Sequence, residues 1–359
     1  MGGGPAGIAA AVAAARAGLD VVLLDRGTFP RPKVCGGCLN GRALAVLSRL
    51  GLSHTLEDAP TTDSVRLRVG SREVRASSPP GRAISRLAWD ERLIAAARAA
   101  GVAVFENTPT SLAGDHLEWR SGRQRGTLAA RTFLAASGLG QTATRDLPNL
   151  AAPPRPGSRI GAGTLLEDDA WPLPPGEVLM IAGRGGYVGL VRVERGLLNI
   201  AAALDAPLLR GRSLSEAVGT FLHEARCPLP RGWHEATWTG TPPLTRTAAR
   251  VVAGRTLVVG DAAGYIEPFT GEGMAWALAS GEALGRSLPR WLASPDEAIA
   301  AREWPATLQR LVRRRTHVCR SLAWWLRHPR LVRLTMPLAP VVMPPTLRWL
   351  GQPRETMPS

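Results

Sequence analysis

A carboxylate followed by a glycine-rich loop is the stretch of this sequence best suited to chemistry. Asp261 comes directly after the apolar run 257–259 and Gly260, and the triplet GEG at 271–273 precedes small and apolar residues at helical spacing from Met274 onward. This pattern predicts a buried strand, a loop and then a buried helix. The carboxylate and the unpaired amides of the helix N-terminus would meet at one place, where they suit a polyol hydroxyl and a developing negative charge.

The N-terminal residues carry a dinucleotide-binding pattern. The sequence GGGPAG at 2–7 places Gly2, Gly4 and Gly7 on the glycines of GxGxxG, with Pro5 and Ala6 between the last two. In this pattern the glycines allow a tight turn, close approach of the backbone to a pyrophosphate, and close helix packing. These five residues are therefore candidate cofactor ligands.

The segment after the glycines fits the same pattern. An Ala-rich helix to about Ala17 and a strand over 21–24 lead to Asp25 and Arg26. An acid about 20 residues after the glycines binds an adenosine ribose in this pattern, so Asp25 is a candidate ligand with Arg26 beside it. Only Met1 precedes the fingerprint, so the first, central strand of the sheet is expected to be missing, which suggests a misplaced start or a truncated chain.

These segments resemble the geranylgeranyl reductase family of FAD-dependent oxidoreductases, which share the para-hydroxybenzoate hydroxylase fold. Residues 260–284 read GDAAGxxxPxxGEGxxxAxxSGxxL, which looks like the second flavin motif of that family. The resemblance implies that Gly260 and Asp261 hold the ribityl chain. It also implies that Gly271, Gly273 and Met274 begin a helix that points at the isoalloxazine. The alternative is a strand, turn and helix whose glycines only permit close packing.

Residues 29–38, FPRPKVCGGC, resemble the PRxKxCGG element of the same family, with Lys33, the only lysine, on its lysine position. The resemblance puts Cys35 and Gly36 beside the isoalloxazine, and Cys35 is the candidate catalytic residue. Read without the family, Cys35 and Cys38 form a CxxC, which is typical of a redox dithiol, half of a zinc site, or two incidental thiols. Zinc needs two further ligands and the sequence has no second pair, so no metal site is expected.

The segment from Ile84, ISRLAWDERLIAAARAAG, resembles the RxxFDxxLxxxAxxxG segment of the family, which gives Arg86 a contact to FAD. An ion pair of Arg86 with Asp90 or Glu91 on the same helix is an equal alternative. Two departures bear on the substrate. Ser-Gly at 137–138 replaces the Asp-Gly of flavin hydroxylases, which argues against a typical hydroxylase. YVGLVR at 187–192 replaces the family's aromatic YxWxFP, so the isoprenoid substrate of the family does not carry over to this chain.

The expected fold class is α/β: a Rossmann-like FAD-binding domain, an antiparallel-sheet substrate domain and a helical C-terminus. Alternation over 64–75 predicts a hairpin on the substrate side, and the strand-like runs EVLMIAG, GYVGLVRVE and LLNIAAAL predict the antiparallel sheet. The expected domains are discontinuous. The FAD-binding domain comprises 1–58, 82–150 and 246–290, the substrate domain comprises 59–81 and 151–245, and the C-terminal helical region comprises 291–359.

Charge is concentrated toward the C-terminus of this 359-residue chain, whose formal net charge is +15. The sequence shows no nucleic-acid-binding module, so no nucleic-acid partner is expected. It has no run of eighteen apolar residues and no charged leader, which predicts a cytoplasmic protein. Arginines with Trp324, Trp325 and Trp349 fit a peripheral surface at the inner membrane face, or alternatively a packed helix with a solvated basic face.

The sequence thus predicts an FAD-dependent oxidoreductase that reduces double bonds of an apolar lipid-, isoprenoid- or quinone-like small molecule. NAD(P)H that docks transiently or a protein electron donor would be the reductant, because no second dinucleotide fingerprint is visible. The main alternative is a monooxygenase that hydroxylates an aromatic or quinol ring. A halogenase of this fold needs a catalytic lysine, and Lys33 already matches another motif. The third alternative is a non-catalytic, membrane-associating remnant without flavin.

Overall fold

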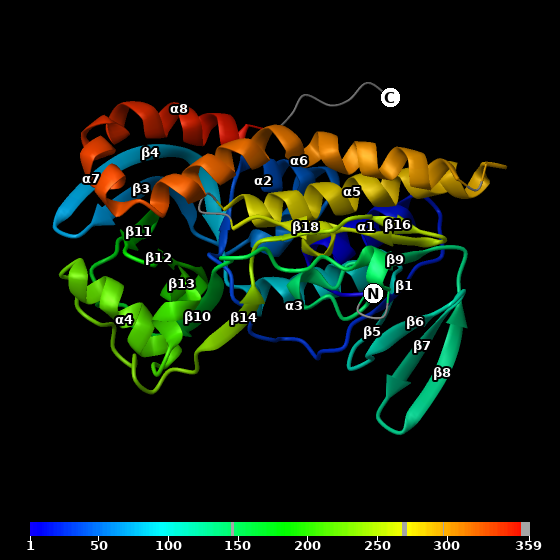
Figure 1. The fold of residues 1–359 in the computed structure, drawn as a ribbon. Coiled ribbons are helices and arrows are strands. Elements are labelled where there is room, and N and C mark those ends of the chain that lie inside the picture. The colour runs from blue at the N-terminus through cyan, green and yellow to red at the C-terminus, as the bar shows by residue number, and fades with distance from the viewer. Residues whose placement is uncertain (145–146, 268–270, 297, 353–359) are drawn as a thin grey trace.

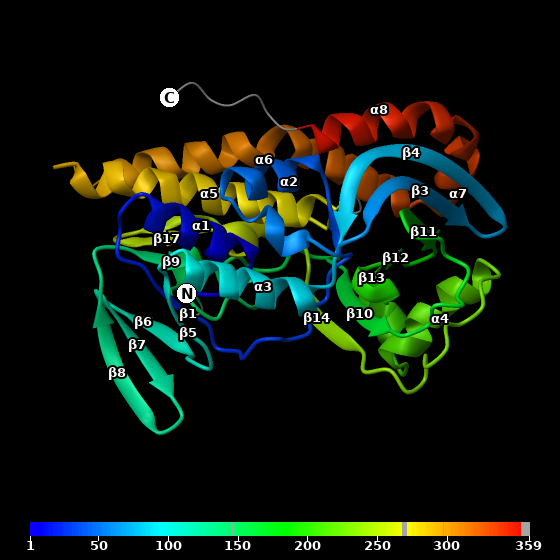
Figure 2. The same ribbon diagram turned by 180° about the vertical axis from the view of Figure 1, so that it is seen from behind.

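The computed structural model describes residues 1–144, 147–267, 271–296 and 298–352. Within these ranges the chain forms the predicted α/β fold, with helices packed on short parallel strands, a large mixed sheet beside them and a helical C-terminus (Figures 1 and 2). The proline of the second flavin motif, Pro268, lies outside the described residues.

Two helices rich in small residues form the centre of one half of the molecule. Helix α1 (Pro5–Arg16) packs against α5 (Glu272–Ala293), and both are buried over most of their length. A Cβ added at Gly281 of α5 would lie 2.2 Å from the carbonyl oxygen of Ala6. Because glycine lacks this atom, the two helix backbones come into direct contact.

Short parallel strands lie beside α1. The pairs are β1 (Val22–Leu24) with β5 (Ala103–Phe105), and β9 (Phe133–Ala135) with β17 (Thr256–Val258). In the part of the chain that the structure describes, no strand precedes α1. Met1 and Gly2 lie between β1 and β9 instead, where the Gly2 N–H donates to the Leu24 carbonyl and the Ala136 N–H donates to the Met1 carbonyl, both at 2.8 Å.

Two further helices complete the core of this half. They are α2 (Gly41–Arg49) and α3 (Arg86–Ala99). Trp89 of α3 is fully buried among α1, α2 and α5, and its indole N–H donates to Thr55 Oγ1 at 3.2 Å. A small antiparallel meander of β6 (Thr110–Ala113), β7 (His116–Ser121) and β8 (Gln124–Ala129) projects from the same half (Figure 1).

An eight-stranded sheet with the order β14-β10-β13-β12-β11-β3-β4-β2 forms the other half. Its strands are β2 (Cys38–Leu39), β3 (Thr61–Val69), β4 (Arg72–Ala83), β10 (Ile160–Leu166), β11 (Glu177–Gly183), β12 (Gly186–Arg192), β13 (Leu198–Leu204) and β14 (Thr239–Pro243). The predicted hairpin and antiparallel sheet are present, and they join through the one parallel pair of this sheet, β11 with β3, among the described strands. Helix α4 (Leu214–Glu224) packs on β11, β12 and β13.

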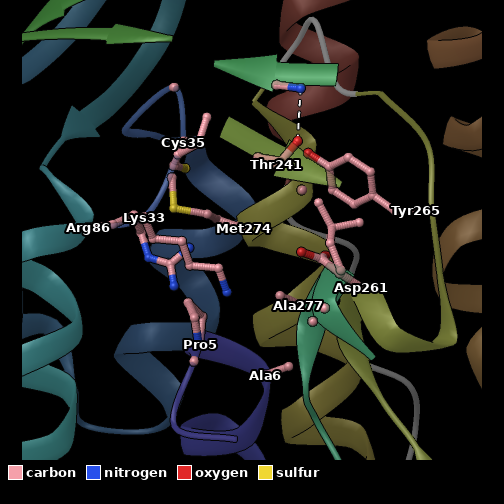
Figure 3. A pocket seen from close by; sticks show the side chains of 18 of the residues that line it. Pro5, Ala6, Lys33, Cys35, Arg86, Thr241, Asp261, Tyr265, Met274 and Ala277 are labelled. Atoms are coloured by element: carbon pink, nitrogen blue, oxygen red, sulfur yellow. Dashed lines mark hydrogen bonds between the residues drawn. The ribbon is translucent and has the colours of Figure 1, made fainter. Parts of the chain in front are cut away.

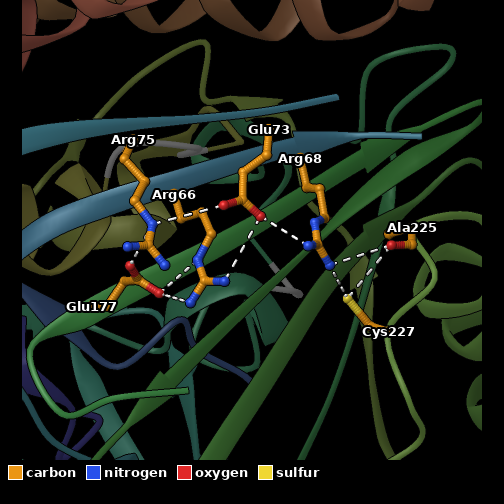
Figure 4. A network of polar contacts seen from close by, with 7 residues as sticks. All are labelled: Arg66, Arg68, Glu73, Arg75, Glu177, Ala225 and Cys227. Carbon is orange, nitrogen blue, oxygen red and sulfur yellow. Dashed lines mark hydrogen bonds and ion pairs between the residues drawn. The ribbon is translucent and has the colours of Figure 1, made fainter. Parts of the chain in front are cut away.

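The two faces of β3 differ in character. Leu67 and Val69 pack into an apolar cluster with the C-terminal helices, whereas Arg66 and Arg68 point to the opposite face. There, Arg66 pairs with Glu177 of β11, and Arg68 lies 2.9 Å from Glu73 of β4 (Figure 4). These ion pairs connect three neighbouring strands. Since a shift of one residue would exchange the charged and apolar faces, the pattern fixes the register of β3.

The C-terminal helices extend across both halves (Figure 2). They are α6 (Ile299–Leu326), α7 (Pro329–Thr335) and α8 (Ala339–Gly351). Helix α6 begins beside α5, where the Trp304 indole N–H donates to the Val258 carbonyl at 2.9 Å. Helices α7 and α8 lie against the β3–β4 hairpin. None of the described helices is both long enough and apolar enough to traverse a bilayer.

Candidate functional site

A cavity of about 1250 Å³ lies between the N-terminal ends of α1 and α5 and the eight-stranded sheet. It is larger than the pockets of about 300–1,000 Å³ that bind drug-sized ligands, so it has room for a dinucleotide and a second small molecule. The candidate residues that line it are Gly2, Gly4, Pro5, Ala6, Asp25, Arg26, Cys35, Gly36, Arg86, Asp261, Gly271, Gly273 and Met274. The fold therefore brings most of the sequence-predicted residues to one cavity.

Gly7 and Gly260 are not among the residues that line this cavity. A Cβ on Gly7 would lie 1.9 Å from the carbonyl oxygen of Gly2, and one on Gly260 would lie 2.6 Å from the Ala6 Cβ. Gly260 also has a φ of +66°, which side chains other than glycine rarely adopt. Both glycines thus support the wall by close packing.

The N-terminus of α1 points its free amides into the cavity between two cations. Gly4 is the N-cap of α1, and no side chain caps the helix. A Cβ on Gly4 would lie 3.8 Å from Arg86 Nη2 and 4.0 Å from Lys33 Nζ, and both side chains extend toward Pro5 in Figure 3. A helix N-terminus flanked by a guanidinium and an ammonium forms an anion site of the kind that binds phosphate groups.

Arg86 forms the ion pair with Asp90 that the sequence offered as one alternative, and it also lines the cavity. Its Nε and Nη2 donate to the two carboxylate oxygens of Asp90 at 2.5 and 2.7 Å, four residues along α3. Because Asp90 is fully buried and holds the guanidinium in a fixed plane, Arg86 presents its charge to the cavity in one orientation.

Asp261 faces Lys33 and Arg86 across the cavity (Figure 3). Burial raises the pKa of the Asp261 carboxyl, and Lys33 and Arg86 oppose that shift. Burial also lowers the pKa of the Lys33 ammonium, with repulsion from Arg86 as the next cause. Both shifts have the sign expected for charged groups that burial has removed from water. A polar ligand bound between them would replace the hydrogen bonds that these groups would otherwise make to water.

The two cysteines of the CxxC are free thiols in the cavity wall. Cys35 Sγ accepts from the Gly37 N–H at 3.5 Å, and Cys38 Sγ donates to the Gly36 carbonyl at 3.4 Å. Burial, followed by the neighbouring Cys35, raises the pKa of Cys38 to about 12. Cys38 is therefore a protonated thiol at neutral pH, which disfavours its action as a nucleophile.

Asp25 is buried at the edge of the cavity by contacts that the sequence did not reveal. Its Oδ2 accepts from the Gly3 N–H at 2.7 Å and lies 3.1 Å from Arg31 Nη2, while its Oδ1 accepts from the Gly27 N–H at 2.7 Å. Arg31 also lies over the Phe29 ring, with 4.7 Å from Cζ to the ring centroid. Gly27 and Arg31 thus hold the loop between β1 and Lys33 against the Asp25 carboxylate.

The opposite end of the cavity is apolar and holds residues that sequence reasoning missed. The apolar side chains there include Val65, Val178, Met180, Leu190, Ala201, Ala203, Leu244, Met343 and Leu347. The chain has two tyrosines, Tyr187 of β12 and Tyr265 of β18 (Gly264–Tyr265), and both line this cavity. Their rarity in the composition is the sequence signal that could have pointed to them.

Tyr187 is backed by a buried group of charges. The Arg159 Cζ lies 5.6 Å from the centroid of its ring. Arg159 in turn donates to Glu267 Oε1 at 2.8 Å and to Asp205 Oδ1 at 3.0 Å. Burial, the charge of Glu267 and a hydrogen bond with Glu267 raise the pKa of Tyr187 well above its usual value. The phenol is therefore protonated at neutral pH.

Comparison with known proteins agrees with this geometry. Residues 1–120 match the family described as FAD binding domain. The chain is 29% identical over 375 residues to the menaquinone reductase of Mycobacterium tuberculosis, an alignment that covers 94% of this chain and 86% of that protein.

Two solved structures of flavin enzymes have the same fold. A flavin-dependent brominase aligns over 98% of this chain and 92% of its own, with a TM-score of 0.80 and 15% identity. A probable FAD-dependent monooxygenase from Pseudomonas aeruginosa aligns over 94% and 98%, with a TM-score of 0.72 and 15% identity. Residues 1–120 therefore match an FAD binding domain, and the chain as a whole has the fold of these two flavin enzymes.

Proposed function

We propose that this protein is an FAD-dependent reductase of a quinone-like or other unsaturated, apolar lipid. The observation that carries this proposal is the division of one cavity into a cationic end at α1 and an apolar end between the large sheet and α8. The similarity to a menaquinone reductase over nearly the full length of both chains supports a quinone.

The residues of the cationic end fit FAD. The uncapped N-terminus of α1, with Lys33 and Arg86 beside Gly4, would hold the diphosphate. Asp25 and Arg26 would bind the adenosine ribose, and Asp261 would bind the ribityl chain. The start of α5 at Gly271, Gly273 and Met274 would lie against the isoalloxazine. Bound FAD would supply hydride transfer, while the protein positions and shields the reacting atoms.

Tyr187 is the proton donor in this proposal. A quinone carbonyl oxygen gains a proton when the quinone becomes a quinol, and Tyr187 Oη holds such a proton in the cavity wall. A phenol is protonated at neutral pH, and because burial and Glu267 raise the pKa of Tyr187, its proton would transfer only when the quinone oxygen has become strongly basic during reduction. Glu267 and Arg159 act as positioning residues, because they are buried behind the ring and fix its surroundings. Tyr187→Phe should lower kcat for quinone reduction without displacing FAD.

A catalytic role for Cys35 is part of the proposal. The neighbouring Cys38 provides a matched control, because both thiols line the cavity and only one is assigned to the flavin side. Cys35→Ser should lower the rate, and Cys38→Ser should not. Equal rates for the two variants would leave Cys35 as a cavity-lining residue only.

Anaerobic turnover tests the function directly. FAD-loaded protein is mixed with menaquinone and with NADH, NADPH or a reduced ferredoxin-type donor, and quinol is measured by its ultraviolet spectrum. The proposal expects quinol to form without oxygen and with one of these two classes of reductant. Oxygen consumption coupled to a hydroxylated product would instead identify a monooxygenase.

A further inference from the structure

The outer face of the C-terminal helices exposes apolar side chains. Of the nine large hydrophobic residues exposed among the described residues, six lie between Trp324 and Trp349. These six are Trp324, Leu334, Leu338, Val341, Val342 and Trp349, and we call them the outer apolar patch. Leu334 and Val341 are about three-quarters exposed, at 76% and 75%. Clustered exposure of this kind marks an interaction surface, whereas scattered apolar residues do not.

The apolar face of α8 continues from one turn to the next. The spacing of its exposed apolar residues is three, one and seven, which places them on one side of the helix. They are Leu338 at the N-cap of α8, then Val341, Val342 and Trp349. The other side of α8 carries Met343 and is also apolar. A helix that is apolar on both sides needs a nonpolar neighbour on both sides, but on the outer side Leu338, Val341 and Val342 are exposed.

The charge around the outer apolar patch has one sign. Between Trp324 and Trp349, the segment that carries the patch, the sequence contains four arginines and no aspartate or glutamate. Arg330 and Arg348 are exposed beside the patch. Indoles and aliphatic side chains among arginines match the boundary between acyl chains and anionic headgroups, where the arginines contribute electrostatic attraction. This charge also argues against self-association through the same face, since two copies would bring like charges together.

The inner face of α8 forms part of the cavity wall. Met343, Leu347 and Gly351 line the cavity together with Ser78 and Pro79 of β4. Helix and strand meet closely, because a Cβ on Gly351 would lie 3.6 Å from Pro79 Cγ. One helix therefore separates the outer apolar patch from the apolar end of the cavity.

We propose that α7 and α8 lie on an anionic bilayer with the outer apolar patch in the interface, and that an apolar substrate passes from the acyl chains into the cavity between α8 and β4. The docking surface stands on the patch and its charge, and only the entry route rests on the proposed function. Helix α8 has 13 residues, or about 20 Å at 1.5 Å per residue, and so it lies in the interface and does not span the roughly 30 Å hydrocarbon core.

Sedimentation with vesicles tests the docking surface. The full chain is mixed with vesicles of phosphatidylcholine alone and of phosphatidylcholine with phosphatidylglycerol. It should bind the anionic vesicles, and the double variant V341S/V342S should bind them at least about tenfold more weakly, because two valines lose their burial. Arg330→Gln and Arg348→Gln should each weaken binding roughly fivefold at low salt.

A matched control uses exposed apolar residues away from the patch. Phe105 and Leu229 are exposed on other elements, so F105S/L229S should bind vesicles as the unaltered protein does. The proposal is overturned if the unaltered protein stays in the supernatant or if V341S/V342S binds equally well. A dimer in analytical ultracentrifugation that V341S/V342S dissociates would assign the patch to a second copy and would also overturn it.

Kinetics with two quinones test the entry route. V341S/V342S should raise KM for a long-chain menaquinone embedded in anionic vesicles and leave KM for a soluble short-chain quinone unchanged. An equal change for both quinones would overturn the route. If the unaltered protein reduces neither quinone, the proposed function and the route fail together, while vesicle binding still decides the docking surface.

Discussion

Arg42 and Glu272 form a buried ion pair, with 2.9 Å between Arg42 Nη1 and Glu272 Oε2, although 230 residues separate them in sequence. The Asn40 side-chain amide donates to the other carboxylate oxygen of Glu272 at 2.6 Å, and Asn40 is also the N-cap of α2. Glu272 is the first residue of α5, where a negative charge is favourable at the helix N-terminus. The pair thereby fixes the first turn of α5 to α2.

Removal of one partner of this pair should destabilise the fold strongly. Arg42→Met leaves the Glu272 carboxylate buried without its cation, and such a change costs about 3–5 kcal/mol. The free energy of unfolding from guanidinium titration measures it. The exposed pair of Arg92 with Asp58 is the matched control, and Arg92→Met should cost less than about 1 kcal/mol. Equal losses for the two variants would contradict a special role for the buried pair.

Lys33→Met should weaken FAD binding through the diphosphate site. The ammonium lies near Gly4 together with Arg86, and a hydrogen bond to a charged group is worth about 1.5–3 kcal/mol, which corresponds to roughly 10- to 150-fold in Kd. Quenching of FAD fluorescence on titration gives this Kd. Arg184→Met, at an exposed position in the turn between β11 and β12, is the control and should leave Kd unchanged. An unchanged Kd for Lys33→Met would remove Lys33 from the cofactor site.

Asp261→Asn should separate stability from cofactor affinity. Because the folded state raises the pKa of Asp261, ionisation of this carboxyl opposes folding, and the penalty grows as pH rises through the folded pKa. The apo form of the variant should therefore be at least as stable as the unaltered apo protein at pH 7. Its FAD affinity should fall about tenfold or more, because the carboxylate is the better acceptor for ribityl hydroxyls.

The pH dependence of the unaltered protein provides a second measurement of Asp261. FAD affinity should decrease as pH falls through a pKa above the usual aspartate value, and this step should be absent in Asp261→Asn. Calorimetric titrations over pH 4 to 8 measure it. Full flavin affinity in the variant would show that Asp261 does not hold the cofactor.

Gly281→Ala should destabilise the contact of α1 with α5. The added Cβ would lie 2.2 Å from the Ala6 carbonyl oxygen, and overpacking of this kind typically costs about 1–3 kcal/mol. Gly219 in the middle of α4 is the control, because its nearest neighbour to an added Cβ is 3.7 Å away. Gly219→Ala should stabilise the protein by up to about 1 kcal/mol through helix propensity. Thermal unfolding gives the change in Tm for each variant. Changes in Tm of the same sign for Gly281→Ala and Gly219→Ala would contradict the prediction.

Local features of the sequence determined the cofactor side. The glycine spacing before α1, the acid after β1 and the Asp261 loop before α5 predicted residues that line one cavity. This succeeds because a helix N-terminus, a tight turn and a helix contact are made by residues near one another in the chain. The fold class and the antiparallel sheet followed from periodicity for the same reason.

Only the tertiary structure decided the apolar end and the supports of the site. Tyr187, Tyr265 and Met343 come from different elements and meet because long-range strand and helix packing brings them together. The pair of Arg42 with Glu272 depends on the same packing. Periodicity reports which face of an element is apolar but not what covers that face, and the energy of a buried charge depends on partners that are distant in sequence.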